Sequence, residues 1–178
     1  MSNFVLLSIS GRDRPGIVRD VAEALLGIQA NIEDSSMTAL RGRFTMMLIV
    51  GLPEEGSLAA LRAALADLEQ RTGLTLQSQA LSDEEVQARA PTPDCVVTVS
   101  GADKPGIVHA VAECLGAESI SIVDLSTRTM EAEGDEMYMM ALEVCAGEQV
   151  DALTAKLADI SRRIHVDIEV HKLETNII

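Results

Sequence analysis

Two related stretches decide the fold of this chain: SGRDRPGIVRDVAEALLGIQANIEDSS, from Ser10 to Ser36, and SGADKPGIVHAVAECLGAESISIVDLS, from Ser100 to Ser126. They lie 90 residues apart, and 14 of their 27 aligned positions are identical without a gap. The similarity resumes between Leu61–Leu81 and Leu153–Leu173, where the apolar pattern matches. An internal repeat of this length indicates two copies of one structural unit.

The repeat sets the expected domain boundaries. We expect domain 1 at residues 1–81, a linker at 82–94 and domain 2 at 95–178. The linker contains Pro91 and Pro93, which cannot continue a helix or join a central strand. The copies differ most around Arg41–Arg43 and Glu131–Glu136, where the second copy is longer and acidic, as a surface hairpin allows.

Each copy begins with a strand followed by a helix. Val5, Leu7 and Ile9 recur at every second position, the period of a half-buried strand. The following turn places Asp13 to cap a helix and Pro15 to start it. The apolar face of this helix is expected to comprise Ile17, Val18, Val21, Ala22, Leu25 and Ile28, and its polar face Arg19, Asp20 and Glu23.

The rest of each copy predicts a hairpin, a second helix and a fourth strand. Leucines such as Leu58, Leu61, Leu65 and Leu68 recur at helical spacing in the first copy. The order βαββαβ predicts an α+β, ferredoxin-like fold, in which two helices pack on one face of an antiparallel sheet. We expect strand two to lie beside strand one. The two copies of one chain can cover each other's open sheet faces, which is the simplest arrangement, or pair edge to edge into a continuous sheet, and a second chain can cover what remains. We therefore also expect a homo-oligomer.

Composition excludes several functional classes. The chain has 178 residues with 14 basic and 28 acidic side chains, and its net charge of −14 disfavours direct nucleic-acid binding. No apolar stretch approaches the roughly 20 residues of a membrane helix, and the N-terminus lacks the pattern of a secretory signal, so we expect a cytoplasmic protein without membrane association. Cys95, Cys114 and Cys145 show no CxxC spacing, which disfavours disulfides and zinc. No catalytic constellation or metal-ligand spacing is present, so we expect no enzyme activity, cofactor or metal.

The turn after strand one offers chemistry for a zwitterionic ligand. Free N–H groups at a helix N-terminus favour a carboxylate, and Asp13 or Asp103 can accept from an ammonium group. Asn31 is expected at the same end of the sheet, where its amide reaches a bound carboxylate; Ser121 replaces it in the second copy. The alternative is structural: Asp13 caps the helix, the glycines shape the turn, and Asn31 is a satisfied turn residue.

One enzymatic alternative concerns the same turn. The spacing of glycines between Gly11 and Arg19 superficially resembles the phosphate cradle of acylphosphatases. The charge of Asp13 opposes a phosphate there, and His109 replaces Arg19 in the second copy, so the sequence disfavours this function.

The motifs D-R-P-G-I-V with A-N-I, and D-K-P-G-I-V with S-I-S-I-V, resemble tandem ACT domains over nearly the whole chain. ACT domains are regulatory modules of ferredoxin-like fold that commonly bind amino acids at the interface of two such domains. The resemblance implies contacts from the loop after strand one and from the start of strand two. The implied ligand-binding residues are Gly11, Arg12, Asp13, Arg14, Pro15, Gly16, Ile17, Val18, Asn31 and Ile32 in copy one, and Asp103, Lys104, Pro105, Gly106, Ile107, Val108, Ser121 and Ile122 in copy two.

An ACT pair of this kind is similar to the glycine cleavage system transcriptional repressor family. That resemblance implies a repressor-like co-regulator that responds to glycine and acts through a DNA-binding activator protein, in keeping with the acidic charge. The alternatives are a regulatory subunit that allosterically controls an amino-acid metabolic enzyme, and an ACT pair that has lost its ligand and serves as an interaction surface.

Overall fold

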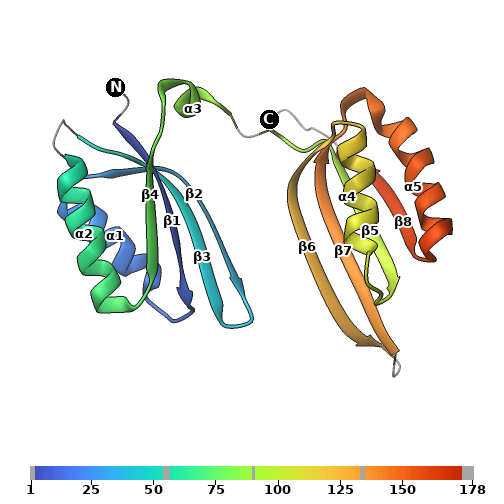
Figure 1. The fold of residues 1–178 in the computed structure, drawn as a ribbon, viewed down its shortest axis with the longest axis horizontal. Coiled ribbons are helices and arrows are strands. Elements are labelled where there is room, and N and C mark those ends of the chain that lie inside the picture. Colours follow the sequence, from blue (N-terminus) through green and yellow to red (C-terminus); the bar gives the residue numbers. More distant parts are fainter. Residues whose placement is uncertain (1–2, 54–56, 90, 133–134, 174–178) are drawn as a thin grey trace. The chain divides into compact units, whose positions relative to one another are not determined.

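The computed structural model describes residues 3–53, 57–89, 91–132 and 135–173. The chain divides into two compact units, Met1–Arg89 and Ala90–Ile178 (Figure 1). Unit 1 contains β1 (Phe4–Arg12), α1 (Ile17–Gly27), β2 (Asn31–Leu40), β3 (Arg43–Gly51), α2 (Ser57–Thr72), β4 (Thr75–Ala80) and the short α3 (Asp83–Gln87). Unit 2 contains β5 (Cys95–Ala102), α4 (Ile107–Ala117), β6 (Ser121–Ala132), β7 (Asp135–Cys145), the 3-10 turn η1 (Gly147–Gln149), α5 (Val150–Ile164) and β8 (Asp167–Lys172).

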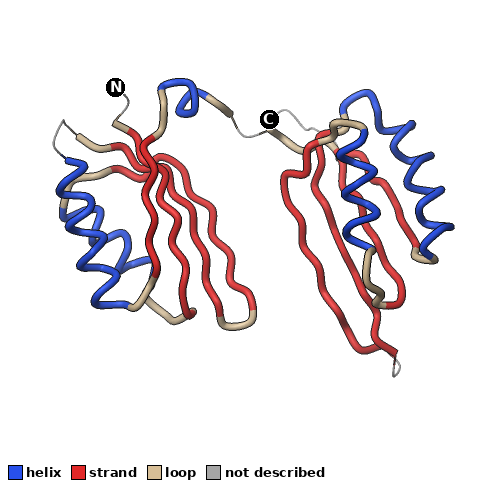
Figure 2. Tube along the Cα trace, in the orientation of Figure 1, coloured by secondary structure: helices blue, strands red, loops and turns tan. Residues whose placement is uncertain are grey.

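Both units have the predicted βαββαβ arrangement. Each forms a four-stranded antiparallel sheet, in the order β2-β3-β1-β4 and β6-β7-β5-β8. Within each unit the two long helices lie on one face of the sheet (Figure 2). The predicted ferredoxin-like fold is confirmed.

The expected position of strand two is wrong. In unit 1, β2 pairs with β3 and forms the sheet edge, while β1 lies between β3 and β4. The reason is topological: β1 and β2 run parallel, the connection through α1 spans one strand position between them, and β3 fills that position by pairing antiparallel with both. The same arrangement holds for β6, β7 and β5 in unit 2.

The core of unit 1 lies between the sheet and its two helices. Alternate residues of β1 point into it, and Leu7 is fully buried. From the helices, Val21 and Leu25 of α1 meet Leu61 and Leu68 of α2 in the same apolar cluster. Alternation of apolar residues therefore predicted the inward face of the central strand.

The expected faces of α1 and α2 need correction at four positions. Val18 is 45% exposed and Ala22 is also exposed, whereas Asp20 is only 8% exposed. The buried stripe of α1 consists of Ile17, Asp20, Val21 and Leu25. Val18 and Ala22 each follow a buried residue, and one step along a helix turns a side chain by about 100°, which points both away from the core. In α2, Leu58 is likewise exposed rather than buried, although the three later leucines of its predicted stripe are buried.

The sheet face opposite the helices is open in each unit. In unit 1 it carries the half-buried Leu6 and the exposed Met47 beside polar residues. In unit 2 the corresponding apolar residues are Met137 and Met139, both exposed. These apolar side chains are available to another molecule.

The segment between the two sheets contains one helical turn. The Ser82 hydroxyl accepts from the Glu85 amide, and the Glu85 carboxylate accepts from the Ser82 amide, which forms a capping box at α3. These hydrogen bonds hold the pKa of Glu85 below its usual value. The prolines follow this helix and none lies within it.

The hairpin of unit 2 extends further than that of unit 1. Its strands β6 and β7 have 12 and 11 residues, against 10 and 9 for β2 and β3. Residues 133–134 of the expected acidic segment Glu131–Glu136 lie outside the described residues, as does the C-terminal segment 174–178 of the expected second domain.

Candidate functional site

The loop between β1 and α1 differs from its sequence-based description. Helix α1 begins at Ile17 with Gly16 as N-cap, and no side chain caps it. Asp13 therefore does not cap the helix, and Pro15 lies before it rather than at its first position; both predictions are wrong. The Asp13 amide instead donates to the Gly42 carbonyl at 2.9 Å, which ties the loop to the turn between β2 and β3.

Gly16 and Gly106 are required by the backbone at the start of each first helix. Their φ angles are +90° and +96°, in the left-handed region that L side chains rarely adopt. Space is not the constraint, since a Cβ at Gly16 would lie 3.6 Å from the Arg19 guanidinium and a Cβ at Gly106 would meet no atom within 4 Å. The backbone geometry of the turn therefore explains the glycine that both loops share.

Gly11 and Gly101 have a packing role. A Cβ at Gly11 would lie 2.5 Å from the Leu74 side chain, and one at Gly101 would lie 3.3 Å from the Val166 Cα. Both contacts fall where the second helix of the unit passes into its last strand. These glycines therefore allow close approach of two backbone segments.

An ion-pair cluster lies beside the first loop. Asp20 accepts from Arg14 Nη2 at 2.6 Å through Oδ2, and from Arg19 Nη2 at 2.7 Å and Nε at 3.1 Å through Oδ1. Arg14 also donates from Nη1 to the Pro15 carbonyl at 3.2 Å. The hydrogen bonds from Arg14 and Arg19 hold the pKa of Asp20 below its usual value, and the bond to Asp20 raises the pKa of Arg19. The buried carboxylate thus fixes two guanidinium groups at one loop.

The second loop lacks this cluster. Lys104, His109 and Ala110 occupy the positions of Arg14, Arg19 and Asp20. None of the ion pairs formed by the described side chains involves Lys104 or His109. The two loops share their backbone and differ in their charged side chains.

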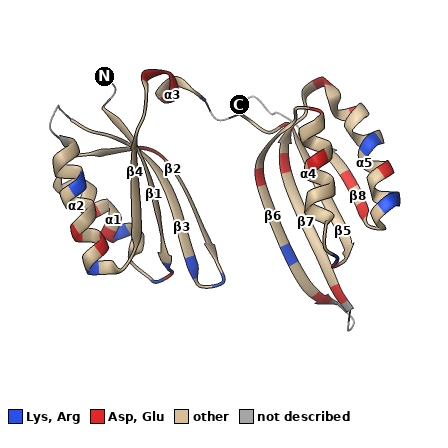
Figure 3. Ribbon diagram, in the orientation of Figure 1, with Lys and Arg blue, Asp and Glu red and all other residues tan. Residues whose placement is uncertain are grey.

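The surroundings of the two loops also differ in charge (Figure 3). In unit 1, Arg12 ends β1 and Arg43 begins β3 directly opposite it, with Arg41 in the turn. In unit 2 the corresponding end of the hairpin carries Glu131 and Glu136. The turn next to the first loop is therefore basic, whereas the end of the hairpin in unit 2 is acidic.

Asn31 does not lie at the end of the sheet where it was expected. Along β3, Gly11 pairs with Phe44 and Asn31 pairs with Gly51. The seven intervening steps of about 3.3 Å place the two residues roughly 23 Å apart. Asn31 donates from Nδ2 to Glu33 Oε1 at 2.8 Å.

Ser121 of unit 2 has the same placement, because Gly101 pairs with Tyr138 and Ser121 with Cys145 on β7. The start of the second strand and the loop within one unit cannot contact the same small ligand. A ligand that touched both would need them from two different copies of the fold.

The remaining predicted residues divide by exposure. The structure brings together Arg12, Asp13, Arg14, Pro15, Gly16 and Val18 at the surface of unit 1, and Asp103, Lys104, Pro105, Gly106 and Val108 at the surface of unit 2. Ile17 and Ile107 belong to the cores, and Ile32 and Ile122 lie at the distant strand starts. Sequence reasoning missed the role of Arg19 and Asp20, which belong to α1 and join Arg14 of the loop in one ion-pair cluster. The signal was present, since the second copy has the apolar Ala110 where the first has Asp20.

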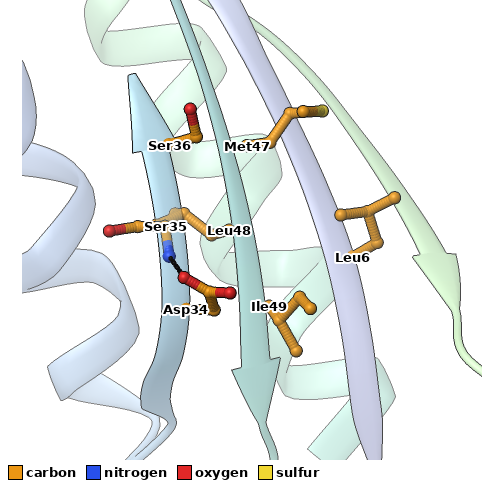
Figure 4. Close-up of a pocket in the computed structure, with 7 residues that line it drawn as sticks. All are labelled: Leu6, Asp34, Ser35, Ser36, Met47, Leu48 and Ile49. Carbon is orange, nitrogen blue, oxygen red and sulfur yellow. Dashed lines mark hydrogen bonds between the residues drawn. The ribbon is translucent and has the colours of Figure 1, made fainter. Parts of the chain in front are cut away.

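A shallow pocket lies on the open sheet face of unit 1, away from the loop (Figure 4). Its volume is about 150 Å³. It is lined by Leu6, Asp34, Ser35, Ser36, Met47, Leu48 and Ile49. The Asp34 carboxylate accepts from the Ser35 amide at 2.7 Å, so the pocket joins an apolar floor to one acidic group.

The described residues form neither a metal site nor a membrane-spanning helix. Within them, no group of three or more His, Cys, Asp or Glu side chains is arranged to hold a metal ion. No helix over the same residues is long and apolar enough to cross a membrane.

Comparisons with known proteins agree with this architecture. The ACT domain family model matches residues 3–79. The glycine cleavage system transcriptional repressor of Escherichia coli is 24% identical over 156 residues, which cover 87% of this chain and 80% of the relative. A UPF0237 protein of Corynebacterium diphtheriae is 34% identical over 83 residues, 45% of this chain and 93% of the relative.

A solved structure of similar architecture extends over both units. The crystal structure of an unknown protein from Galdieria sulphuraria superposes with a TM-score of 0.79 at 29% identity and covers 97% of this chain and 99% of that chain. Together with the βαββαβ units and the glycine-containing loops, these similarities identify the chain as a member of the ACT domain family.

Proposed function

We propose that this protein is a non-catalytic, amino-acid-sensing regulator that responds to glycine and acts as a transcriptional co-regulator through a DNA-binding protein partner. The observation that carries the proposal is its similarity to the Escherichia coli glycine cleavage system transcriptional repressor over 87% of the chain, which includes both copies. The net charge of −14 supports action through a protein rather than on DNA, because an acidic surface repels the phosphate backbone.

The ligand in this proposal binds at the loop after the first strand. Gly16 and Gly106 place no side chain of their own at a helix N-terminus, where backbone N–H groups attract a carboxylate. Asp13 and Asp103 are exposed in the same loops and can accept from the ammonium group of an amino acid. Asn31 contributes only when another copy of the fold supplies it, because it lies at the opposite end of its own sheet.

The partner in this proposal binds an open sheet face. Met47 in unit 1 and Met139 in unit 2 expose flexible apolar side chains, which suit a protein interface. The same faces suit a homo-oligomer. A ligand bound at the loops regulates the partner only if it binds the partner-bound and free states with different affinity.

Amino-acid sensing is tested by thermal unfolding of the full chain with glycine, serine, branched amino acids and a buffer blank. A ligand that binds only the folded state at 100 times its Kd adds about 2.7 kcal/mol to the free energy of unfolding. For a unit of about 90 residues this raises Tm by roughly 10 °C or more. We expect glycine to give the largest shift, and an unchanged Tm across the panel refutes sensing.

The partner is tested by affinity capture with and without glycine. Recovery of a helix-turn-helix protein in a glycine-dependent amount supports the co-regulator. Recovery of an amino-acid metabolic enzyme instead supports the alternative function, a regulatory subunit that controls this enzyme.

A further inference from the structure

The two loops are chemically unequal at three positions: one lies within the shared motif, as Arg14 or Lys104, and the other two follow it in the helix. The shared motif fixes the backbone, with Gly16 and Gly106 at nearly the same φ. Arg14, Arg19 and Asp20 form hydrogen-bonded ion pairs at the first loop. The second copy has Lys104, His109 and Ala110 at these positions.

Asp20 holds both guanidinium groups by their edges. Its two oxygens take one Nη2 each, and Oδ1 also takes Arg19 Nε, so both Arg19 donors converge on one oxygen while Arg14 binds the other. Asp20 is 8% exposed, while the side chain of Arg19 is 77% exposed. The carboxylate is therefore an internal support and the arginine head group faces outward.

Donor capacity remains on both arginines after these bonds. A guanidinium has five N–H donors, and Arg14 and Arg19 each use two of them in these contacts. Two positive charges against one negative leave the contact cluster cationic. Glu23, one turn further along α1, acts on Arg19 only by a weaker coulombic attraction.

We infer that the first loop of this chain is its carboxylate-binding site, with Arg14 and Arg19 as the receptor groups and Asp20 as the residue that positions them. The inference rests on the proposed function, which it deepens by assigning the carboxylate of an amino acid to unit 1. The second loop, with a lysine, an imidazole and an alanine in place of Asp20, binds that carboxylate far more weakly.

The inference is tested by titrating the ¹⁵N-labelled full chain with glycine and, in parallel, with glycinamide, which lacks the carboxylate. Glycine is expected to shift the backbone amides from Arg14 to Asp20 saturably, with at least about tenfold weaker effects from Lys104 to Ala110. Glycinamide is expected to leave both loops unshifted. Equal response of the two loops, or equal binding of glycinamide, overturns the inference while sensing stands; no response anywhere overturns both.

Variants separate positioning from charge. Arg19→Lys keeps the charge of an exposed side chain but loses the paired bonds to Asp20, and it is expected to weaken glycine binding about 10- to 100-fold. His109→Ala is the matched control and is expected to leave binding unchanged.

Asp20→Asn gives the sharpest contrast. If Asp20 acted only through its negative charge, the variant would bind glycine more tightly; as a positioning residue its loss weakens binding. If Asp20→Asn binds glycine as tightly as the original protein or more tightly, the positioning role is overturned. If Asp20→Asn does not fold, the same outcome for Arg19→Lys overturns it.

Discussion

Replacing Gly106 with alanine tests whether backbone geometry or side-chain space explains the glycine at the start of α4. At φ +96° an L residue costs about 1–2 kcal/mol relative to glycine. A Cβ at this position would meet no atom within 4 Å, so no steric contribution is added. We therefore expect Gly106→Ala to lower the free energy of unfolding of unit 2 by about 1–2 kcal/mol.

The matched control lies in the same helix. Gly116 is also free of contacts within 4 Å, but it lies within α4, where glycine is less favourable than alanine. Gly116→Ala should raise the free energy of unfolding by about 0.5–1 kcal/mol. The two substitutions add the same methyl group to one unit and are expected to act in opposite directions.

Urea unfolding followed by tyrosine fluorescence measures both effects. The chain has one tyrosine and no tryptophan, and Tyr138 is buried in unit 2, so its emission reports that unit. With a slope of about 1–2 kcal/mol per M for a unit of this size, Gly106→Ala should lower the midpoint by about 1 M. A neutral Gly106→Ala, or destabilisation by both variants, refutes the backbone explanation.

Three further predictions concern packing, pH and thiol reactivity. Leu7→Ala removes a fully buried side chain and should cost about 2–5 kcal/mol in urea unfolding, whereas Leu6→Ala on the open sheet face should cost about 1 kcal/mol or less. The Asp94 carboxylate accepts from two backbone amides at the start of η1, and these hydrogen bonds lower its pKa. The ionised carboxylate therefore stabilises unit 2 above the pKa that Asp94 has in the unfolded chain, and this stabilisation is lost as pH falls through the pKa of the folded state. Asp94→Asn should accordingly make the free energy of unfolding of unit 2 depend less on pH on the acid side. Burial raises the pKa of the Cys95 thiol to about 11, so little of it is thiolate at pH 8. Iodoacetamide at this pH should modify the partly exposed Cys114 and Cys145 first, and Cys95 only after denaturation. Peptide mass spectrometry would show this order.

The fold was predictable because the chain presents its pattern twice. Alternation in β1 and the leucine spacing of α2 are signals from within one element, and the second copy repeats them. Strand order was not predictable in this way, since periodicity within an element does not say which strand fills the place beside β1. The misplacement of Asn31 has a separate cause: β1 and β2 both pair antiparallel with β3 and so run parallel, which places the start of β2 at the end of the sheet where β1 begins.

The loop was harder to predict than the strands. Asp13 and Pro15 have the residue types of a helix start, yet the left-handed Gly16 delays the helix by a turn and takes over the N-cap. Asp20 was assigned to the polar face because it is charged, although its position lies on the buried stripe. Asp20 can be buried because Arg14 of the loop and the neighbouring Arg19 donate hydrogen bonds to its carboxylate. Hydrophobic periodicity along the helix does not reveal such contacts.

The claim that this chain senses an amino acid is tested most directly by equilibrium dialysis of the purified full-length protein against radiolabelled glycine. The account predicts saturable binding that competes with unlabelled glycine and is not displaced by glycinamide. A folded protein that retains no glycine above the dialysis blank would contradict it.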